Sequence, residues 1–353
     1  MTMEPSVLQI VWIVLIAILW IGYFILEGFD FGVGMLLPVL GKTEAEKRTL
    51  LTTLGPLWDG NEVWLLVAGG ATFAAFPEWY ATLFSGFYLP LFLILLALIA
   101  RGVAFEYRSK HGDTKWRARW DIAIVAGSFL PSLLWGVAFA NLVRGVEIEK
   151  LDGGGFLYTG GFFALLNPFS LLGGLVTLTL FLTHGAIFVS LKTDGEIRHR
   201  ARALSFQIGA VAAVLAVVFL LWAQLAYSIK TITWVPVLLA AVLWVGALVA
   251  GRIGREGWAF ILSAGTLALA VTSLFAILYP NVMPNIDRTL EGLTIANASS
   301  TEGTLKIMTI VAVVMTPIVL LYQSWTYWVF RKRLTADMIA NPERGVLDDV
   351  VTH

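Results

Sequence analysis

The sequence predicts an all-α protein that crosses a lipid bilayer about nine times, and its composition and its long apolar segments both point to this fold class. Of the 353 residues, 58% are hydrophobic and only 14% are charged. Globular domains usually carry about 25% charged residues, so a soluble chain of this length could not bury so much apolar mass in one core. The bilayer is the simplest solvent for such a sequence.

Nine apolar segments are long enough to cross about 30 Å of hydrocarbon, which takes about 20 residues of α-helix. The second and fifth contain Gly, Pro and polar residues, so we expect a kink or a tilt in each. We expect one integral-membrane domain, residues 1–353, with two four-helix bundles and a last, peripheral helix. The expected helices are 7–26, 50–76, 79–105, 120–144, 160–190, 204–228, 235–251, 258–280 and 305–330.

The distribution of basic residues predicts how these helices are oriented. With the N-terminus outside, the cytoplasmic loops and the C-terminal tail hold 18 of the 24 Lys and Arg residues, and the external loops hold 5. Positive charge collects on the cytoplasmic side of membrane proteins, so we expect an external N-terminus and a cytoplasmic C-terminus. The first apolar stretch begins at Val7 behind one charge, Glu4, without a basic leader, so we expect it to remain as a membrane helix.

The composition also excludes several classes of site. The chain has no cysteine, which excludes disulfides, iron–sulfur clusters and thiolate zinc sites. The formal net charge is zero, so there is no basic surplus with which to bind nucleic acid. No loop is long enough for a soluble catalytic domain, since the longest external loop covers only 281–304.

Acidic residues are concentrated in the N-terminal half, where the bilayer penalises them. Glu27 and Asp30 stand at the cytoplasmic end of the first expected helix, and Asp59 and Glu62 lie within the second. If that helix starts near Leu50, Asp59 lies roughly 13 Å deep and must be paired, hydrated or protonated. Two carboxyl groups three residues apart share a helix face, and such pairs release their protons in separate steps. We therefore predict a proton path along these four acids.

The same polar residues can also be read as structural. Arg101, near the end of the third expected helix, could neutralise Asp59 or Glu62 in an ion pair that fixes helix register, and Asn61 could simply join helices. His184 lies deep in the fifth expected helix, but the other three histidines fall in loops or the tail. A haem held between facing helices would lack a second buried histidine. We predict no metal site, with His184 as the sole candidate ligand and a hydrogen-bonded interface as its favoured role.

Nine sequence runs stand out in order along the chain: GFDFGVGML (28–36), WDGNEVWL (58–65), AGGATFAAFPEWYATLFSGFY (68–88), RGVAFEYRSK (101–110), GSFLPSLLWGVAFANLVRG (127–145), YTGGFFALLNPFSLLGG (158–174), LTHGA (182–186), WAFILSAGTLA (258–268) and YPNVMP (279–284). Together they resemble subunit II of the cytochrome bd-type quinol oxidases. The similarity runs from residue 7 to about 330 and is densest before residue 190.

This resemblance implies a subunit of a terminal oxidase in the bacterial cytoplasmic membrane, which oxidises quinol and reduces O2 to water. It implies a heterodimer with a haem-bearing subunit I, which holds haem b and haem d. Some members add a small accessory subunit or a structural quinone. By motif position, Asp59 is assigned to proton delivery, and Glu27 and Asp30 match further acids. The residues assigned to support are Trp58, Asn61, Arg101 and Glu106.

A proton-coupled secondary transporter is the alternative, because transporters also place acids at the middle of the membrane. They usually do so with broken helices in inverted repeats, and the two halves of this sequence show no matching pair of interrupted segments. A purely structural subunit is a third reading, which differs from the first only in whether Asp59 moves protons.

Overall fold

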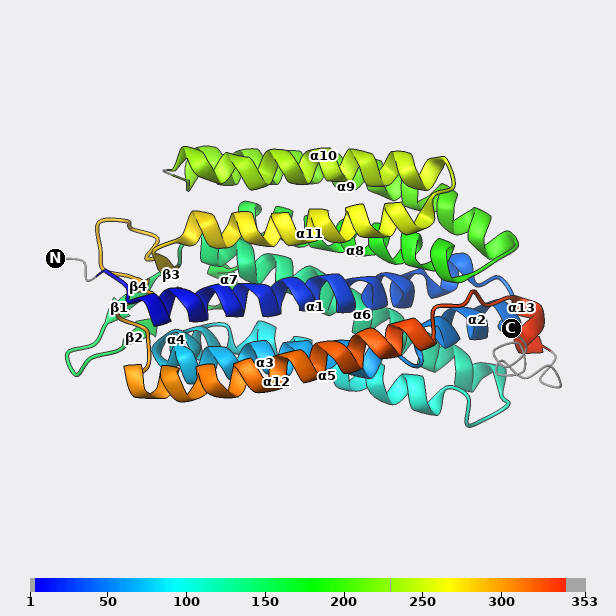
Figure 1. The fold of residues 1–353 in the computed structure, drawn as a ribbon, viewed down its shortest axis with the longest axis horizontal. Helices are drawn as coiled ribbons and strands as arrows, with labels where there is room; N and C mark the ends of the chain where they lie inside the picture. Colours follow the sequence, from blue (N-terminus) through cyan, green and yellow to red (C-terminus); the bar gives the residue numbers. More distant parts are fainter. Residues whose placement is uncertain (1–3, 229, 341–353) are drawn as a thin grey trace.

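Long helices make up almost all of the molecule and run along its longest axis (Figure 1). The computed structural model describes residues 4–228 and 230–340. Eight helices in this part are long and apolar enough to cross a membrane, so the chain is an integral membrane protein, as its composition predicts. They are α1 (Val7–Leu40), α5 (Tyr88–Tyr107), α6 (Thr114–Arg144), α8 (Pro168–Lys192), α9 (Glu196–Ala226), α10 (Trp234–Arg252), α11 (Glu256–Leu278) and α12 (Glu302–Val329).

Shorter elements lie mainly at the two ends of the long axis. Two small antiparallel sheets, β1 with β2 and β3 with β4, lie at the end where α1 begins, and α2 and α13 lie at the opposite end (Figure 1). The strands are β1 (Ile148–Lys150), β2 (Phe156–Tyr158), β3 (Asn281–Met283) and β4 (Leu293–Thr294). The shorter helices are α2 (Glu44–Leu54), α3 (Trp58–Ala75), α4 (Pro77–Gly86), α7 (Gly161–Ala164), α13 (Ala336–Ala340) and a 3-10 turn over Thr231–Thr233.

The first helix is longer than the expected segment 7–26, because α1 continues to Leu40. Glu27 and Asp30 therefore lie inside the helix rather than at its end, and both are buried. Their charges interrupt the hydropathy pattern, which is why the sequence places the helix end there. The backbone nevertheless stays helical because both side chains find polar partners on other helices.

The expected helix 50–76 is wrong as one continuous element. It consists of α2 and α3, which are separated at Gly55-Pro56, because proline has no amide donor for the next hydrogen bond of the helix. Asp59 thus lies in the first turn of α3, and the depth argued from a helix starting near Leu50 does not hold. The polar first turn also keeps α3 out of the eight apolar helices.

Two other expected segments are divided as well. Residues 79–105 belong to α4 and α5, which meet at Phe87. Residues 160–190 include the short α7 and most of α8, which begins at Pro168 behind the cap Asn167. Proline is favoured in the first turn of a helix. Pro90 lies in the first turn of α5 and Pro168 is the first residue of α8, so a proline accompanies each break. The five expected segments 120–144, 204–228, 235–251, 258–280 and 305–330 each correspond to one helix, α6 and α9–α12.

Helix α1 is central and contacts α3, α6, α8 and α11. Its crossing with α8 is very close: a Cβ added at Gly32 would lie 2.1 Å from the carbonyl oxygen of Phe181 and 2.8 Å from Cα of Gly185. Small residues permit such approach between membrane helices. Of the eight long apolar helices, α12 is the least enclosed, since Leu305 is its only buried residue.

Candidate functional site

A buried ion pair joins α1 to α5 at the centre of the candidate site. The Nη1 atom of Arg101 donates to Oε1 of Glu27, and both side chains are 0% exposed. The guanidinium also lies over the rings of Phe31, at 4.7 Å, and Phe105, at 5.2 Å. The ion pair and the cation–π contacts offset the large cost of removing these charges from water.

Asp30 extends this site toward α3 and α12. Its Oδ2 atom accepts a hydrogen bond of 2.7 Å from Nδ2 of Asn61, which is buried in the first turn of α3. The Oδ1 atom of Asn61 in turn accepts from the hydroxyl of Tyr327 at 2.8 Å and from Nε2 of Gln323 at 3.3 Å. Asn61 therefore connects the first helix of the chain to the last long one.

Sequence reasoning missed the contribution of α12. Gln323 and Tyr327 are four residues apart and so share a helix face, which was the available signal in an otherwise apolar segment. The Oε1 atom of Gln323 also accepts from Nε1 of Trp64 at 2.8 Å, which adds a second link between α12 and α3. We call Glu27, Asp30, Asn61 and Arg101 the buried cluster.

Four polar atoms of the buried cluster have no hydrogen-bond partner in the described part of the chain. They are Oε2 of Glu27, Oδ1 of Asp30, and Nε and Nη2 of Arg101. Buried polar groups are almost always hydrogen-bonded, and internal water commonly meets this need where several such groups converge. The buried cluster thus has both acceptors and donors to offer to water or to a moving proton.

The other two acids of the predicted path lie outside the buried cluster. Asp59 is exposed on the outer surface of α3, so the structure does not bring it into contact with Glu27 or Asp30. Glu62 is half-buried and lies within electrostatic range of both Asp59 and Arg101. It therefore stands between the exposed acid and the buried cluster.

Two residues predicted to support Asp59 have other surroundings. Trp58 is half-buried and packs against Phe105 of α5, with ring centroids 5.2 Å apart. Glu106 is exposed near the end of α5 and is not part of the buried cluster. Of the predicted supporting residues, the structure brings only Arg101 and Asn61 to the buried acids.

His184 lies at a junction of three helices. Its Nδ1 atom is 2.8 Å from the hydroxyl of Ser263, its Nε2 atom is 3.2 Å from the carbonyl oxygen of Ile25, and its ring stacks on Phe260 at 4.7 Å. Both ring nitrogens are engaged, which matches the favoured interface role. Residues 4–228 and 230–340 contain no group of three His, Asp or Glu side chains suited to a metal ion.

Comparison with known proteins decides the family. The model of the family described as cytochrome bd terminal oxidase subunit II matches residues 8–330. The chain belongs to this family. It is 38% identical over 370 residues to the cytochrome bd-I ubiquinol oxidase subunit 2 of Escherichia coli (strain K12), covering 95% of this chain and 97% of that protein. It is 42% identical over 330 residues to the cytochrome bd ubiquinol oxidase subunit 2 of Bacillus subtilis (strain 168), covering 92% and 96%.

A solved structure has the same fold. The structure of bd oxidase from Geobacillus thermodenitrificans includes a chain that matches with a TM-score of 0.75 and 18% identity, covering 93% of this chain and all of that one. The family model and the two relatives confirm the resemblance seen in the sequence. The subunit is part of an oxidase, and the transporter alternative has no observation in its favour.

Cytochrome bd implies haem, but the described residues of this subunit do not fit a haem site. Membrane haem is usually held by axial His or Met from facing helices. His184 uses both ring nitrogens, and His111 and His199 lie outside the interior. Of the two deeply buried methionines, Met35 and Met283, neither is paired with a free histidine.

Proposed function

We propose that this chain is the non-haem subunit of a bd-type quinol oxidase, which supports a haem-bearing subunit I and conducts protons from the cytoplasm toward it. The partner would carry haem b and haem d and oxidise quinol, while the reduction of O2 to water consumes the protons. The observation that carries the proton role is the buried cluster, in which the Glu27–Arg101 ion pair and the Asp30–Asn61 hydrogen bond leave four buried polar atoms without a partner in the described part of the chain.

The proposed path begins at Asp59, passes Glu62, and reaches Glu27 and Asp30. Asp59 would be the exposed entry group, and Glu62, which lies within electrostatic range of both Asp59 and Arg101, would be the next group. Internal water held by the unpartnered oxygens would complete the connection, because hydrogen-bonded water relays protons between groups that do not touch. Trp58 and Asn61 would position the first turn of α3 and so hold Asp59 in place.

The exposed carboxylate of Asp59 on α3 is evidence that a partner subunit covers this side of the helix. Exposed apolar side chains follow Asp59 along α3, at Val63, Leu66, Val67 and Phe73, and the bilayer would penalise the charge of Asp59. A subunit that covers α3 would instead keep Asp59 in a polar, protein-lined passage.

We further propose nine crossings, with an external N-terminus and a cytoplasmic C-terminus in the bacterial inner membrane. Helix α3 has 18 residues, or about 27 Å at 1.5 Å per residue, which is enough to add a ninth crossing to the eight apolar helices. An odd number fits a chain whose α1 begins at one end and whose α13 lies at the other (Figure 1). Helices α1, α3, α5 and α6 would form one bundle, α8–α11 the second, and α12 the peripheral helix.

Co-expression tests the proposed division of labour. Produced alone, this subunit should show no haem absorption, and produced with subunit I it should copurify in a complex with haem b and haem d bands. A small accessory subunit or a structural quinone would appear in the mass spectrum of the same preparation. Haem bound stoichiometrically by the isolated subunit would contradict the proposal.

A further inference from the structure

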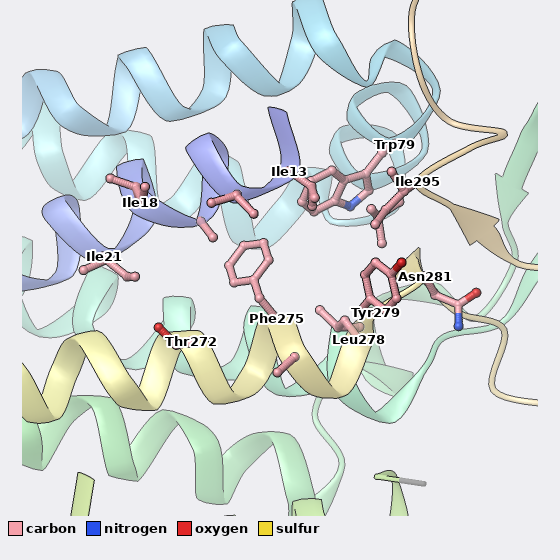
Figure 2. Close-up of a pocket in the computed structure, with 14 residues that line it drawn as sticks. Ile13, Ile18, Ile21, Trp79, Thr272, Phe275, Leu278, Tyr279, Asn281 and Ile295 are labelled. Carbon is pink, nitrogen blue, oxygen red and sulfur yellow. The ribbon is translucent and has the colours of Figure 1, made fainter. Parts of the chain in front are cut away.

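An apolar cavity opens between α1 and α11, close to the end of the molecule that carries the two small sheets. Its volume is about 320 Å³, and its walls are aliphatic and aromatic side chains. Figure 2 shows Ile13, Ile18 and Ile21 of α1 along one side, Phe275 and Leu278 of α11 along the other, and Trp79 at the end. The lining residue Ile18 is 49% exposed, so the cavity opens on the outer surface of the helices.

One polar group in this cavity has no partner. Trp79 is 3% exposed, and its Nε1 atom is buried without a hydrogen bond to any residue of the described ranges 4–228 and 230–340. A buried indole N–H normally finds an acceptor, and leaving it unpaired is costly. The second large cavity, among α6 and α8–α11, differs here, because its Trp244 donates to the carbonyl oxygen of Gly209 at 3.0 Å.

A cation lies beside the mouth of the cavity. The Nζ atom of Lys230 donates to the carbonyl oxygen of the lining residue Tyr279 at 2.9 Å and lies 4.3 Å above the centre of its ring. No carboxylate in the described part of the chain forms an ion pair with Lys230, so its charge has no protein counterion there. An ammonium held in this way attracts an anionic group arriving from the membrane interface.

We propose that this cavity binds one acyl chain of an anionic phospholipid from the external leaflet. The chain fills the space between α1 and α11, an ester carbonyl accepts the hydrogen bond from Trp79, and the phosphate lies next to Lys230. The volume suits a chain segment on the order of ten carbons if each occupies about the 30 Å³ of a water molecule. A quinone would satisfy the indole but leaves the cation without a counterion. This site is separate from the buried cluster and does not depend on the proton role.

The test uses the complex with subunit I, stripped of loosely bound lipid in detergent and examined by native mass spectrometry. Dioleoylphosphatidylglycerol, dioleoylphosphatidylcholine and ubiquinone are added as separate probes. We expect one phosphatidylglycerol to be retained about tenfold more tightly than phosphatidylcholine, the value of about one charge-assisted contact. Trp79→Phe, which keeps the ring and removes the N–H, should weaken both lipids about five- to tenfold.

Matched variants separate the contributions of charge and cavity. Lys230→Gln should abolish the preference for phosphatidylglycerol, whereas Lys306→Gln, on an exposed lysine paired with Glu302, should preserve it. Ala276→Phe should fill the cavity and remove the bound lipid. If Trp79→Phe fails to assemble, Ala276→Phe and Lys230→Gln are sufficient to test the proposal. Equal retention of phosphatidylglycerol by the wild-type complex, Lys230→Gln and Ala276→Phe, or displacement of lipid by ubiquinone, would overturn the proposal.

Discussion

Arg101 of α5 and Glu27 of α1 form an ion pair in which neither side chain exposes any surface. Removing one partner of such a pair leaves the other as an uncompensated buried charge, at a cost of about 3–5 kcal/mol. We expect Arg101→Gln to lower the melting temperature of the purified complex strongly. The double variant Arg101→Gln/Glu27→Gln should recover part of that loss, because no charge is left unpaired. A double variant less stable than Arg101→Gln would contradict the pairing.

Asp59→Asn should slow oxygen consumption without preventing assembly. The side chain is exposed, so amide replaces carboxylate at little cost in stability. Loss of a proton-transfer group costs on the order of a hundredfold or more in rate where that transfer is limiting, so we expect turnover to fall at least about tenfold. Haem content, read from the absorption spectrum, should stay at the wild-type level. Glu302→Gln, on an exposed acid at the other end of the molecule, is the control, and unchanged turnover in Asp59→Asn would assign Asp59 a structural role.

Tyr327→Phe tests the link between α12 and Asn61. The variant removes a hydrogen bond of 2.8 Å, and such a bond contributes about 0.5–1.5 kcal/mol net. We expect a small but measurable decrease in the melting temperature of the complex. Tyr322→Phe is the matched control, because Tyr322 is on the same helix and is 67% exposed. Equal effects of the two variants would show that the hydroxyl of Tyr327 does not hold α12.

Gly32→Ala should be among the most damaging small substitutions in the chain. The new Cβ would meet the backbone of α8 at 2.1 Å, and backbone atoms cannot rotate away as a side chain can. Gly69→Ala on α3, where no atom lies within 4 Å of the added Cβ, should be neutral or stabilising because alanine favours helix by about 1 kcal/mol. The yield of folded complex in detergent distinguishes the two, and normal assembly of Gly32→Ala would show that α1 and α8 can separate.

Glu46 gives α2 a pH-dependent anchor outside the membrane-spanning helices. Partial burial raises the pKa of this carboxyl. The backbone amides of Lys42 and Thr43 and the guanidinium of Arg200 together lower the pKa by more than burial raises it, so the net pKa is below the ordinary value of 4.5. A lowered folded-state pKa means that this stabilisation is complete above about pH 4.5 and is lost as pH falls through the folded-state value. We expect Glu46→Gln to cost about 1 kcal/mol at pH 7.

The difference between the wild-type complex and Glu46→Gln should shrink in acid, because protonation removes the charge of Glu46 from the wild-type complex and the variant has none to lose. Melting curves at pH 7 and below pH 4 measure it. Glu291→Gln, which removes an exposed ion pair with Lys150, should have little effect at either pH because such pairs contribute little. If the difference in melting temperature between the wild-type complex and Glu46→Gln stayed constant across this pH range, the effect of Glu46 on stability would not depend on its charge.

Much of the fold follows from apolar segment length, because the bilayer imposes it. Helices such as α10 and α11 needed only about 20 uninterrupted apolar residues to be predicted. Prolines changed the outcome at three places: Pro56 lies between α2 and α3, and Pro77 and Pro168 start new helices. Pro38, Pro131 and Pro317, by contrast, lie inside α1, α6 and α12 without dividing them. A hydropathy pattern cannot register such breaks, since proline itself is not strongly polar.

The candidate site was predictable by residue type but not by arrangement. Glu27, Asp30 and Arg101 were identified as costly in a membrane, and the structure brings these three together. Asp59 was expected deep in the same path, but helix phase places it on the outer surface of α3 while Asn61, two residues later, faces inward. Which residues face inward depends on where the helix begins, and the sequence placed that start some eight residues too early.

The bond between Asn61 and Tyr327 spans 266 residues of sequence. A ribosome therefore delivers the first four members of this network long before the last helix that completes it. Until α12 enters the membrane, the side-chain oxygen of Asn61 lacks its two donors from α12, Gln323 and Tyr327. The first helices therefore contain a hydrogen-bond acceptor without these partners during synthesis. A chain cut short before α12 would leave the side-chain oxygen of Asn61 permanently without the donors Gln323 and Tyr327, so truncation of the last long helix disturbs a site built mainly from the first ones.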